Sequence, residues 1–180
     1  MSTLKPTVSA EDHILGSINA PVILAEYGDF GCPHCAIAHV FIKKLLVKFK
    51  DQIAFVFRHF PLTKVHQYAT IAAISSEAAA NQGKFWEMHD MILENQSKLS
   101  DSRLLRFAKQ LDLDIKSFQR DIKDEKLSAK VEAQFESGIR SGVNGTPSLY
   151  INGTKYNGAY DLDSLSSAIE AEIHSQQASQ

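Results

Sequence analysis

Two cysteines, Cys32 and Cys35, are the residues of this sequence best suited to chemistry, and its 180 residues contain no other cysteine. Residues three apart at the start of a helix lie on neighbouring turns, close enough for a disulfide. The free N–H groups and the positive end of the helix dipole would stabilise a thiolate on Cys32. Thiols in such positions have pKa values of roughly 3.5–7.5. The spacing predicts a redox pair in which Cys35, one turn deeper and less exposed, is the resolving thiol.

The two residues between the cysteines suit the same chemistry. Pro33 fits the first turn of a helix, where its missing N–H costs nothing. His34 could add positive charge or a hydrogen bond at the Cys32 sulfur, which would favour the reduced dithiol and make the pair more oxidising. Outside this motif, His34 would be an ordinary exposed histidine.

The Cys-x-x-Cys spacing has other uses, and two of them stay open as alternatives. Structural zinc usually needs four ligands and the sequence has no second cysteine pair, but Cys32, Cys35 and His39 could share one helical face and offer three. A thioredoxin-fold chaperone or binding module with unreactive cysteines is the second alternative. A c-type haem is excluded, because Ala36 and not histidine follows Cys35.

The elements around the cysteines follow a strand–helix–strand order. Residues 22–27 are apolar except for Glu26, which is typical of a strand buried on both faces. Apolar residues then recur at helical spacing over 33–48, and 53–57 form a second short apolar strand. In this helix we expect Ile37, Val40, Phe41, Ile42, Leu45 and Leu46 to form the apolar face. The pattern predicts a parallel βαβ unit with a right-handed crossover.

Glu26 is the second candidate for chemistry, because a carboxylate inside a buried strand is costly unless it is paired or held neutral. Burial would raise its pKa and suit it to exchange a proton with Cys35. A side chain that escapes to solvent at the strand end is an equally good interpretation of the strand alone.

The remainder of the chain predicts a helical block, a hairpin and a last helix. We expect helices over 66–82, 84–95 and 125–141, with two more after Asp101 and Asp114. In the 125–141 helix, Leu127, Val131, Phe135 and Ile139 repeat at i, i+4 intervals. Strands at 148–151 and 154–156 flank an Asn-Gly turn, which is a hairpin signal. Asp161 would cap the last helix, and the Ser/Gln-rich tail at 174–180 should fray. We therefore predict one α/β domain over residues 1–180, with an all-helical insertion at about 63–142.

The composition excludes several partner classes. A net charge of −2 and a pI near 6.4 give no bias toward nucleic acid, and no apolar run approaches the roughly 18–20 residues that span a bilayer. The first ten residues lack the apolar stretch of a secretory signal. We therefore expect a cytoplasmic protein, or a periplasmic one if an export signal had been removed, that acts on proteins or small molecules.

These motifs resemble the DsbA-like branch of the thioredoxin superfamily, whose fold carries a helical insertion between its βαβ and ββα halves. The resemblance covers roughly residues 20–173 and rests first on Cys32-Pro33-His34-Cys35, which is more specific than a bare Cys-x-x-Cys. The other matching positions are Glu26, six residues before Cys32; Phe30, the upstream aromatic; 145–147, the cis-proline loop; and 157–161, the stretch after the hairpin.

The resemblance implies a protein-disulfide oxidoreductase without organic cofactor or metal. It would exchange disulfides with protein or small-molecule thiols through a mixed disulfide, and a redox partner would recycle it. An isomerase is disfavoured, because the chain has no room for a separate dimerisation domain. The implied catalytic residues are Cys32, Cys35, Pro33, His34 and Glu26, and the implied substrate-binding residues are Thr146 and Pro147.

Two features of the 145–147 segment qualify the resemblance. Only about 5–6% of X–Pro bonds are cis, so frequency alone predicts a trans bond before Pro147. The resemblance to the family instead implies a cis bond there. Thr146 stands where typical members have valine, at a position that influences redox poise. The oxidase and reductase directions therefore both stay open.

Overall fold

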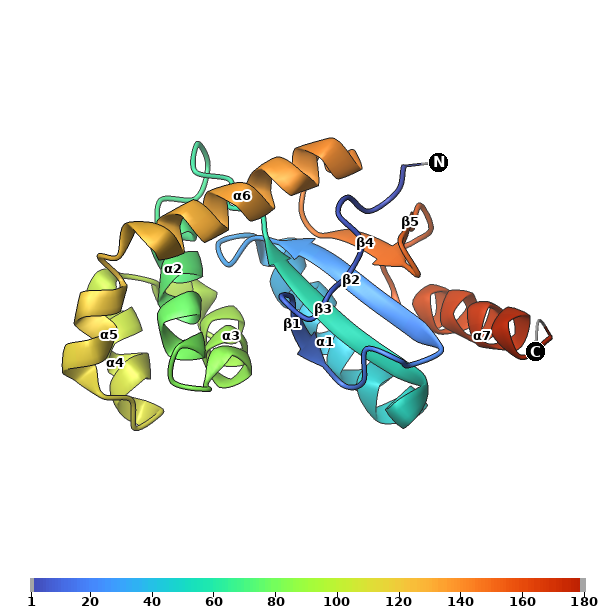
Figure 1. Ribbon diagram of the computed structural model, residues 1–180, viewed down its shortest axis with the longest axis horizontal. Coiled ribbons are helices and arrows are strands. Elements are labelled where there is room, and N and C mark those ends of the chain that lie inside the picture. Colours follow the sequence, from blue (N-terminus) through green and yellow to red (C-terminus); the bar gives the residue numbers. More distant parts are fainter. Residues whose placement is uncertain (1, 179–180) are drawn as a thin grey trace.

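Residues 2–178, which the computed structural model describes, contain a mixed sheet of five strands that runs through the middle of the molecule (Figure 1). The two central strands are parallel to each other, and the other neighbouring strands are antiparallel. In spatial order the strands are β1 (His13–Leu15), β3 (Ile53–His59), β2 (Val22–Gly28), β4 (Ser148–Ile151) and β5 (Thr154–Lys155).

Strand β1 was not predicted, whereas the other four strands were. It has three residues, which are too few to show a periodic pattern, and it forms because it pairs antiparallel with the edge of β3. None of the helices in the described part of the chain is long and apolar enough to pass through a bilayer.

Helix α1 (Pro33–Phe49) joins the parallel strands β2 and β3, which confirms the predicted βαβ unit. The prediction that Ile37 and Val40 face the core is wrong, because their exposed fractions are 51% and 49%. The helix has two apolar stripes, and the one that packs inward also contains a cysteine and a histidine. Its buried residues are Cys35, Ala38, His39, Ile42, Leu45 and Phe49.

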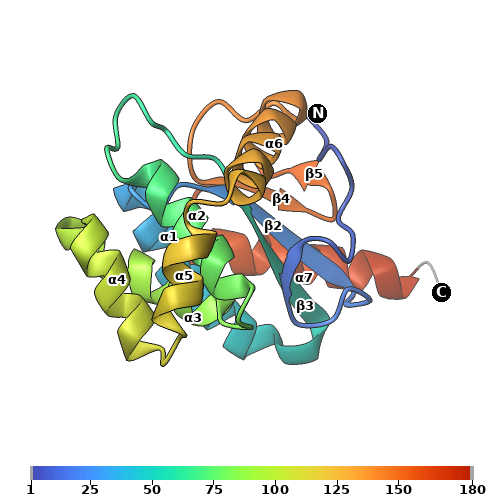
Figure 2. The same ribbon diagram turned by 60° about the vertical axis from the view of Figure 1, so that its left-hand side comes forward.

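Five helices follow β3 and form the predicted helical block. Figure 1 shows α4 and α5 at the end of the molecule away from the sheet, and Figure 2, turned so that this end comes forward, shows α5 in front of α2 and α3. Side chains of Ser100, Asp114 and Asp124 cap the last three, with Asp114 accepting from the backbone N–H of Ser117 at 2.7 Å. The helices are α2 (Ala69–Ala80), α3 (Phe85–Leu93), α4 (Asp101–Gln110), α5 (Ile115–Asp121) and α6 (Glu125–Ser141), with a short 3₁₀ turn, η2 (Gln96–Lys98), after α3.

Helix α6 has the predicted bounds, but its inward face rotates along its length. Leu127 is buried as expected, whereas Ile139 is 55% exposed. Gly138 packs so closely on Phe60 that a Cβ there would lie 2.5 Å from its ring, and Ser141 is buried as well. Small residues therefore replace the predicted apolar stripe where α6 crosses the sheet.

The two faces of the sheet belong to two different cores. Alternate residues of β2 point to opposite faces, and Val22 and Leu24 join the larger core with α1, α7 (Leu162–Ala178) and the helical block. Ala25 and Tyr27 join the smaller core, on the side that α6 covers. Glu26 has the parity of Val22 and Leu24, so its side chain points toward α1.

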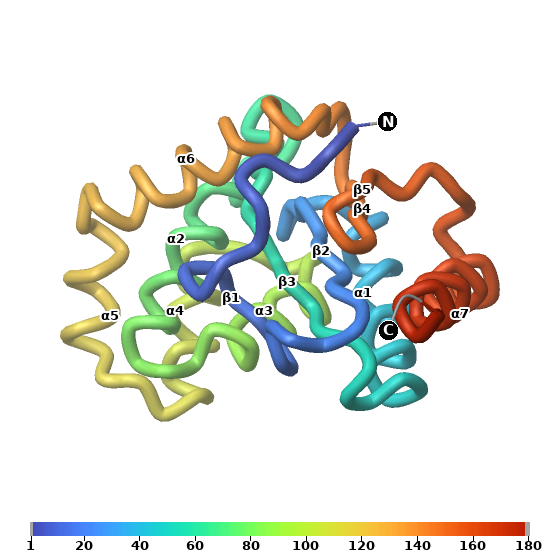
Figure 3. Tube along the Cα trace, turned by 45° about the vertical axis from the view of Figure 1, so that its right-hand side comes forward, coloured from blue at the N-terminus to red at the C-terminus, as the bar shows by residue number. Residues whose placement is uncertain are grey.

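The C-terminal half forms largely as predicted. Asn152 and Gly153 both have positive φ, as a two-residue primed turn requires, and join β4 to β5. Figure 3 shows the N-terminal segment running beside this hairpin, where Leu4 donates to the Gly153 carbonyl. Asp161 caps α7 by accepting from the Ser164 N–H at 2.8 Å. We expected the chain to fray from residue 174, but helix α7 continues to Ala178, so this prediction is wrong for residues 174–178. Residues 179–180 lie outside the described residues.

Candidate active site

Cys32 and Cys35 sit at the start of α1 as free thiols of unequal burial. Cys32 is the N-cap residue and is 5% exposed, whereas Cys35 is fully buried. The Cys32 Sγ lies 3.3 Å from the carbonyl oxygen of Thr146, and the Cys35 Sγ accepts from the Asp29 N–H at 3.4 Å. The spacing thus places one sulfur near the surface and the other in the core.

The surroundings of the two sulfurs move their pKa values in opposite directions. The pKa of Cys32 is lowered to about 5, and a hydrogen bond from Cys35 is the largest cause. The Thr146 side chain and the backbone N–H groups of Cys35 and His34 lower this pKa further, whereas burial of the sulfur raises it. Burial above all raises the pKa of Cys35, as do its hydrogen bond to Cys32 and the charge of Glu26. At neutral pH the pair is a Cys32 thiolate beside a Cys35 thiol.

His34 and Pro33 occupy the predicted positions but are exposed. Pro33 takes the first helical position of α1. His34 helps to lower the Cys32 pKa through its backbone N–H.

Glu26 is buried in β2, so of the two interpretations of its side chain the buried one holds. It is 1% exposed, and its Oε1 has no hydrogen-bond partner in the described residues. Burial raises the pKa of Glu26 to about 8, the charge of Cys32 adds to this, and a hydrogen bond with Cys35 acts against it. The carboxyl group therefore meets Cys35 in a protonated form at neutral pH.

The segment before β4 approaches the cysteines from the side opposite α1. The Thr146–Pro147 peptide bond is cis, as the family resemblance implies and against the frequency of X–Pro bonds. The Thr146 carbonyl of this segment faces the Cys32 sulfur.

Two residues that hold the cysteine loop were missed from the sequence. The buried Asp29 carboxylate accepts from the N–H groups of Gly31 at 2.8 Å and Leu62 at 3.0 Å, and pairs with His66 Nδ1 at 2.6 Å. An Asp that follows a strand and precedes Gly by two residues is a turn signal that could have identified it.

The second missed residue is Gln96, in the 3₁₀ turn η2. Its Nε2 donates to the carbonyls of Phe30 at 2.8 Å and Cys32 at 2.9 Å. Nothing in the polar stretch around Gln96 indicates this contact, because the partners are more than sixty residues away. The helical block is thus bonded directly to the loop that carries Cys32.

A mostly apolar groove of about 250 Å³ lies beside the cysteines, between α1 and the cis-proline segment. The exposed Ile37 belongs to it, so part of the outer apolar stripe of α1 faces this groove. Its lining residues include His34, Ile37, Phe41, Thr146, Pro147 and Tyr160.

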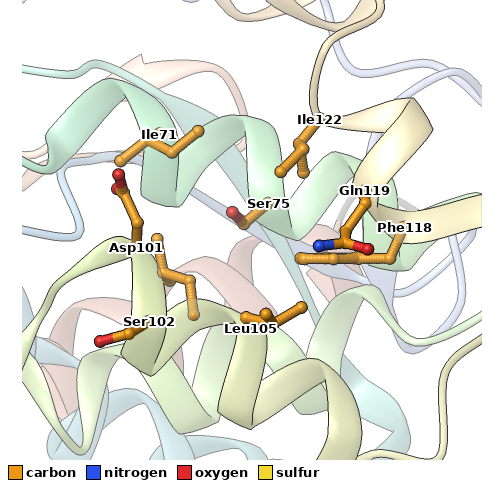
Figure 4. A pocket seen from close by; sticks show the side chains of 9 residues that line it. Ile71, Ser75, Asp101, Ser102, Leu105, Phe118, Gln119 and Ile122 are labelled. Carbon is orange, nitrogen blue, oxygen red and sulfur yellow. The ribbon is translucent and has the colours of Figure 1, made fainter. Parts of the chain in front are cut away.

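A second pocket, of about 270 Å³, lies inside the helical block (Figure 4). Its apolar wall includes Ile71, Leu105 and Phe118. Its polar members are Ser75, Asp101, Ser102 and Gln119. It shares no residue with the groove or the cysteine pair, so it does not belong to the candidate active site.

The zinc site suggested for Cys32, Cys35 and His39 is not assembled. Within residues 2–178, the one group of three potential metal ligands is His39, His89 and Asp90, and neither cysteine belongs to it. His39 instead faces α3.

Comparisons with known proteins agree with this geometry. A thioredoxin family model matches residues 8–171. The Na⁺/H⁺ antiporter NhaA 3 of Salinispora tropica is 41% identical over 164 residues, which are 91% of this chain and 25% of the antiporter. The chain thus spans about a quarter of the length of the curated relatives it matches.

Solved structures share the fold over most of the chain. Wolbachia pipientis α-DsbA1 aligns with a TM-score of 0.86 and 22% identity, covering 97% of this chain and 96% of that one. The thiol–disulfide exchange protein α-DsbA2 of the same organism aligns with a TM-score of 0.79 and 26% identity, covering 91% and 88%.

Proposed function

The chain belongs to the thioredoxin family and carries the Cys-x-x-Cys pair of its DsbA-like thiol–disulfide oxidoreductases, and we propose that it oxidises protein thiols by donating the Cys32–Cys35 disulfide. The observation that carries the direction is the stabilised Cys32 thiolate, with a pKa of about 5. Whatever stabilises the reduced pair makes the disulfide a stronger oxidant. Relative to an ordinary thiol at pH 7, a pKa near 5 stabilises the reduced form by about 3 kcal/mol, which is about 60 mV for a two-electron couple.

The reaction begins with attack of a substrate thiolate on the Cys32 sulfur of the disulfide. The Cys32–Cys35 bond breaks, its electron pair leaves on Cys35, and a substrate–Cys32 mixed disulfide forms. A second substrate thiolate then attacks the substrate sulfur of that mixed disulfide. Cys32 leaves as a thiolate, which is the better leaving group the lower its pKa, and the substrate keeps the new disulfide.

Glu26 supplies the proton that Cys35 needs in the first step. Its pKa of about 8 keeps it protonated at pH 7, and the raised pKa of Cys35 makes that sulfur the stronger base once it is released. When the pair is oxidised again by a recycling redox partner, Glu26 takes the proton back.

Substrate would lie in the groove of about 250 Å³ beside Cys32. Its apolar lining suits the exposed side chains of an incompletely folded protein, and Thr146 and Pro147 would align the substrate backbone with the sulfur. A strongly oxidising Cys32–Cys35 pair would be kept in its reduced form by the glutathione pool of the cytosol. We therefore place the reaction in an oxidising compartment such as the periplasm rather than in the cytoplasm.

The test of direction is a titration of the Cys32–Cys35 pair in glutathione buffers of known potential. We expect a potential above about −220 mV, the upper limit of the cytosolic glutathione poise. A potential below that poise would mean a reductase and overturn the proposal.

The test of mechanism uses the oxidised protein and reduced, unfolded ribonuclease A. Cys32→Ser should abolish disulfide transfer to the ribonuclease, because the attacked sulfur is gone. Reduced Cys35→Ser, mixed with disulfide-bonded ribonuclease, should instead accumulate a mixed disulfide that a non-reducing gel resolves, because Cys32 attacks the substrate disulfide and no Cys35 remains to release it. Disulfide transfer retained by Cys32→Ser would exclude this mechanism.

A further inference from the structure

Helix α1 carries a second cluster of titratable side chains on the turn that follows the cysteines. His39 of α1 and His89 of α3 are both buried, and their rings meet edge to face with centroids 5.5 Å apart. Asp90 of α3 and Glu94, the residue that follows α3, cover the cluster toward solvent, with side chains 37% and 51% exposed. The redox chemistry described above uses none of these four residues.

Three of the potential ligand atoms converge on one point. The Nδ1 of His89 lies 3.0 Å from Asp90 Oδ1, the Nε2 of His39 lies 3.9 Å from the same oxygen, and all three atoms are within 4.8 Å of one another. Ligands of a tetrahedral zinc ion stand about 2.0–2.2 Å from the metal, so they are about 3.3 Å apart. Shifts of about 1 Å or less in side-chain atoms would bring this set to that geometry. Glu94 Oε1, 3.3 Å from His39 Nε2, is close enough to complete it.

We propose that His39, His89 and Asp90 bind a divalent transition-metal ion, for which Zn²⁺ fits best, with Glu94 or water as the fourth ligand. Two imidazoles and a carboxylate are the ligand types that zinc shares with its tetrahedral sites in other proteins. A Mg²⁺ or Ca²⁺ ion would instead need several oxygen ligands, which this cluster does not offer.

Lys43 organises the carboxylate side of the cluster. Its Nζ lies 3.1 Å from Asp90 Oδ2 and 3.1 Å from Glu94 Oε1. Because Lys43 binds the outer oxygen of Asp90, the inner oxygen Oδ1 stays directed at the two imidazoles. Such contacts orient metal ligands in known sites.

The walls of the site provide burial on one side and access on the other. Ile42, Phe55 and Trp86 border the cavity of about 250 Å³ to which His39, His89 and Asp90 also belong. This apolar wall excludes water from the imidazoles, while the half-exposed carboxylates leave an entry path. A metal here would link α1, which carries the cysteines, to α3 of the helical block.

The test is a Co²⁺ titration of the protein with Cys32 and Cys35 oxidised, so that neither thiol can act as a ligand. We expect one Co²⁺ per chain, visible absorption bands without sulfur-to-cobalt charge transfer, and displacement by Zn²⁺. Zn²⁺ should also raise the midpoint of thermal unfolding of the same oxidised protein. The readout does not involve disulfide exchange, so it is independent of the proposed function.

Asp90→Asn is the decisive variant, because Asp90 is partly exposed and its replacement leaves the core intact. It should weaken Co²⁺ binding by at least about tenfold. Glu87→Gln is the matched control: Glu87 lies on the same helix, forms its ion pair with Lys84 and is not a proposed ligand, so its replacement should change the affinity far less than Asp90→Asn does. No Co²⁺ bound at millimolar concentration, or equal binding by wild type and Asp90→Asn, would overturn the site.

Discussion

Replacing Glu26 with Gln should stabilise the reduced protein, and the gain should grow with pH. Glu26 has a pKa of about 8 in the folded protein against 4.5 as its ordinary value. Between these pH values the folded state holds a proton that the unfolded chain has lost. Ionisation of the unfolded chain then favours unfolding, so the stability contributed by this residue falls as pH rises. Gln cannot ionise and removes this penalty.

The size of the effect follows from the same shift. Each pH unit between 4.5 and 8 changes the free energy of unfolding by about 1.4 kcal/mol. The penalty is absent below about pH 4.5, reaches about 3 kcal/mol at pH 7 and levels off near 5 kcal/mol above pH 8. The buried amide of Gln adds a constant cost of about 1–3 kcal/mol for unmade hydrogen bonds, so the slope with pH is the quantity to measure.

Cys32 contributes an opposite slope in the same pH range. Its pKa is lowered from 9.0 to about 5, so between these values the unfolded chain holds the extra proton and stability rises with pH. Wild-type stability alone would therefore hide the effect of Glu26. Both proteins contain Cys32, so the part of its contribution that does not depend on the charge of Glu26 cancels in their difference.

Urea unfolding under reducing conditions at several pH values from 5 to 8 gives the required free energies. The Glu170→Gln variant is the matched control, because Glu170 lies on the solvent side of α7 in a surface pair with Lys48 and its replacement should change stability only slightly. A difference between wild type and Glu26→Gln that stays flat with pH would refute the assignment of a raised pKa to Glu26.

The thiolate absorbance of the reduced protein should titrate near pH 5, because hydrogen bonds stabilise the Cys32 thiolate; a midpoint above pH 8 would contradict this. Thr146→Val removes one of those stabilising groups and should raise that midpoint, measured by the same absorbance. Gln96→Ala leaves two carbonyl groups of the cysteine loop without their donor and should lower the free energy of unfolding by about 2 kcal/mol. In the same urea unfolding experiment, Gln110→Ala at the exposed end of α4 should change it by less than about 0.5 kcal/mol.

The redox pair and its supporting elements were predictable because their signals are local. A buried apolar run, a proline at the first helical position and two cysteines one turn apart specify a strand, a helix start and a disulfide within fourteen residues. The Asn152-Gly153 turn is equally local, since both residues adopt the positive φ that a primed turn requires.

The face of each helix was less predictable, because a helix with more than one apolar stripe does not indicate which stripe packs inward. In α1 the sequence favoured Ile37 and Val40, but the sheet and α3 bury Cys35 and His39 instead. Ile37 of the exposed stripe then lines the groove beside the active site.

The identity of the redox pair, the order of the elements and the place of the helical block can be predicted from local patterns, because these depend on neighbours along the chain. The burial of Glu26 beside Cys35, the hydrogen bond from Gln96 to the Cys32 carbonyl and the contact of His39 with His89 are visible only in the folded protein. Each of those contacts joins elements that come together only when the sheet and the helical block pack. Burial, which sets the pKa of Glu26 and Cys35, is likewise a property of that packing and not of the residues themselves.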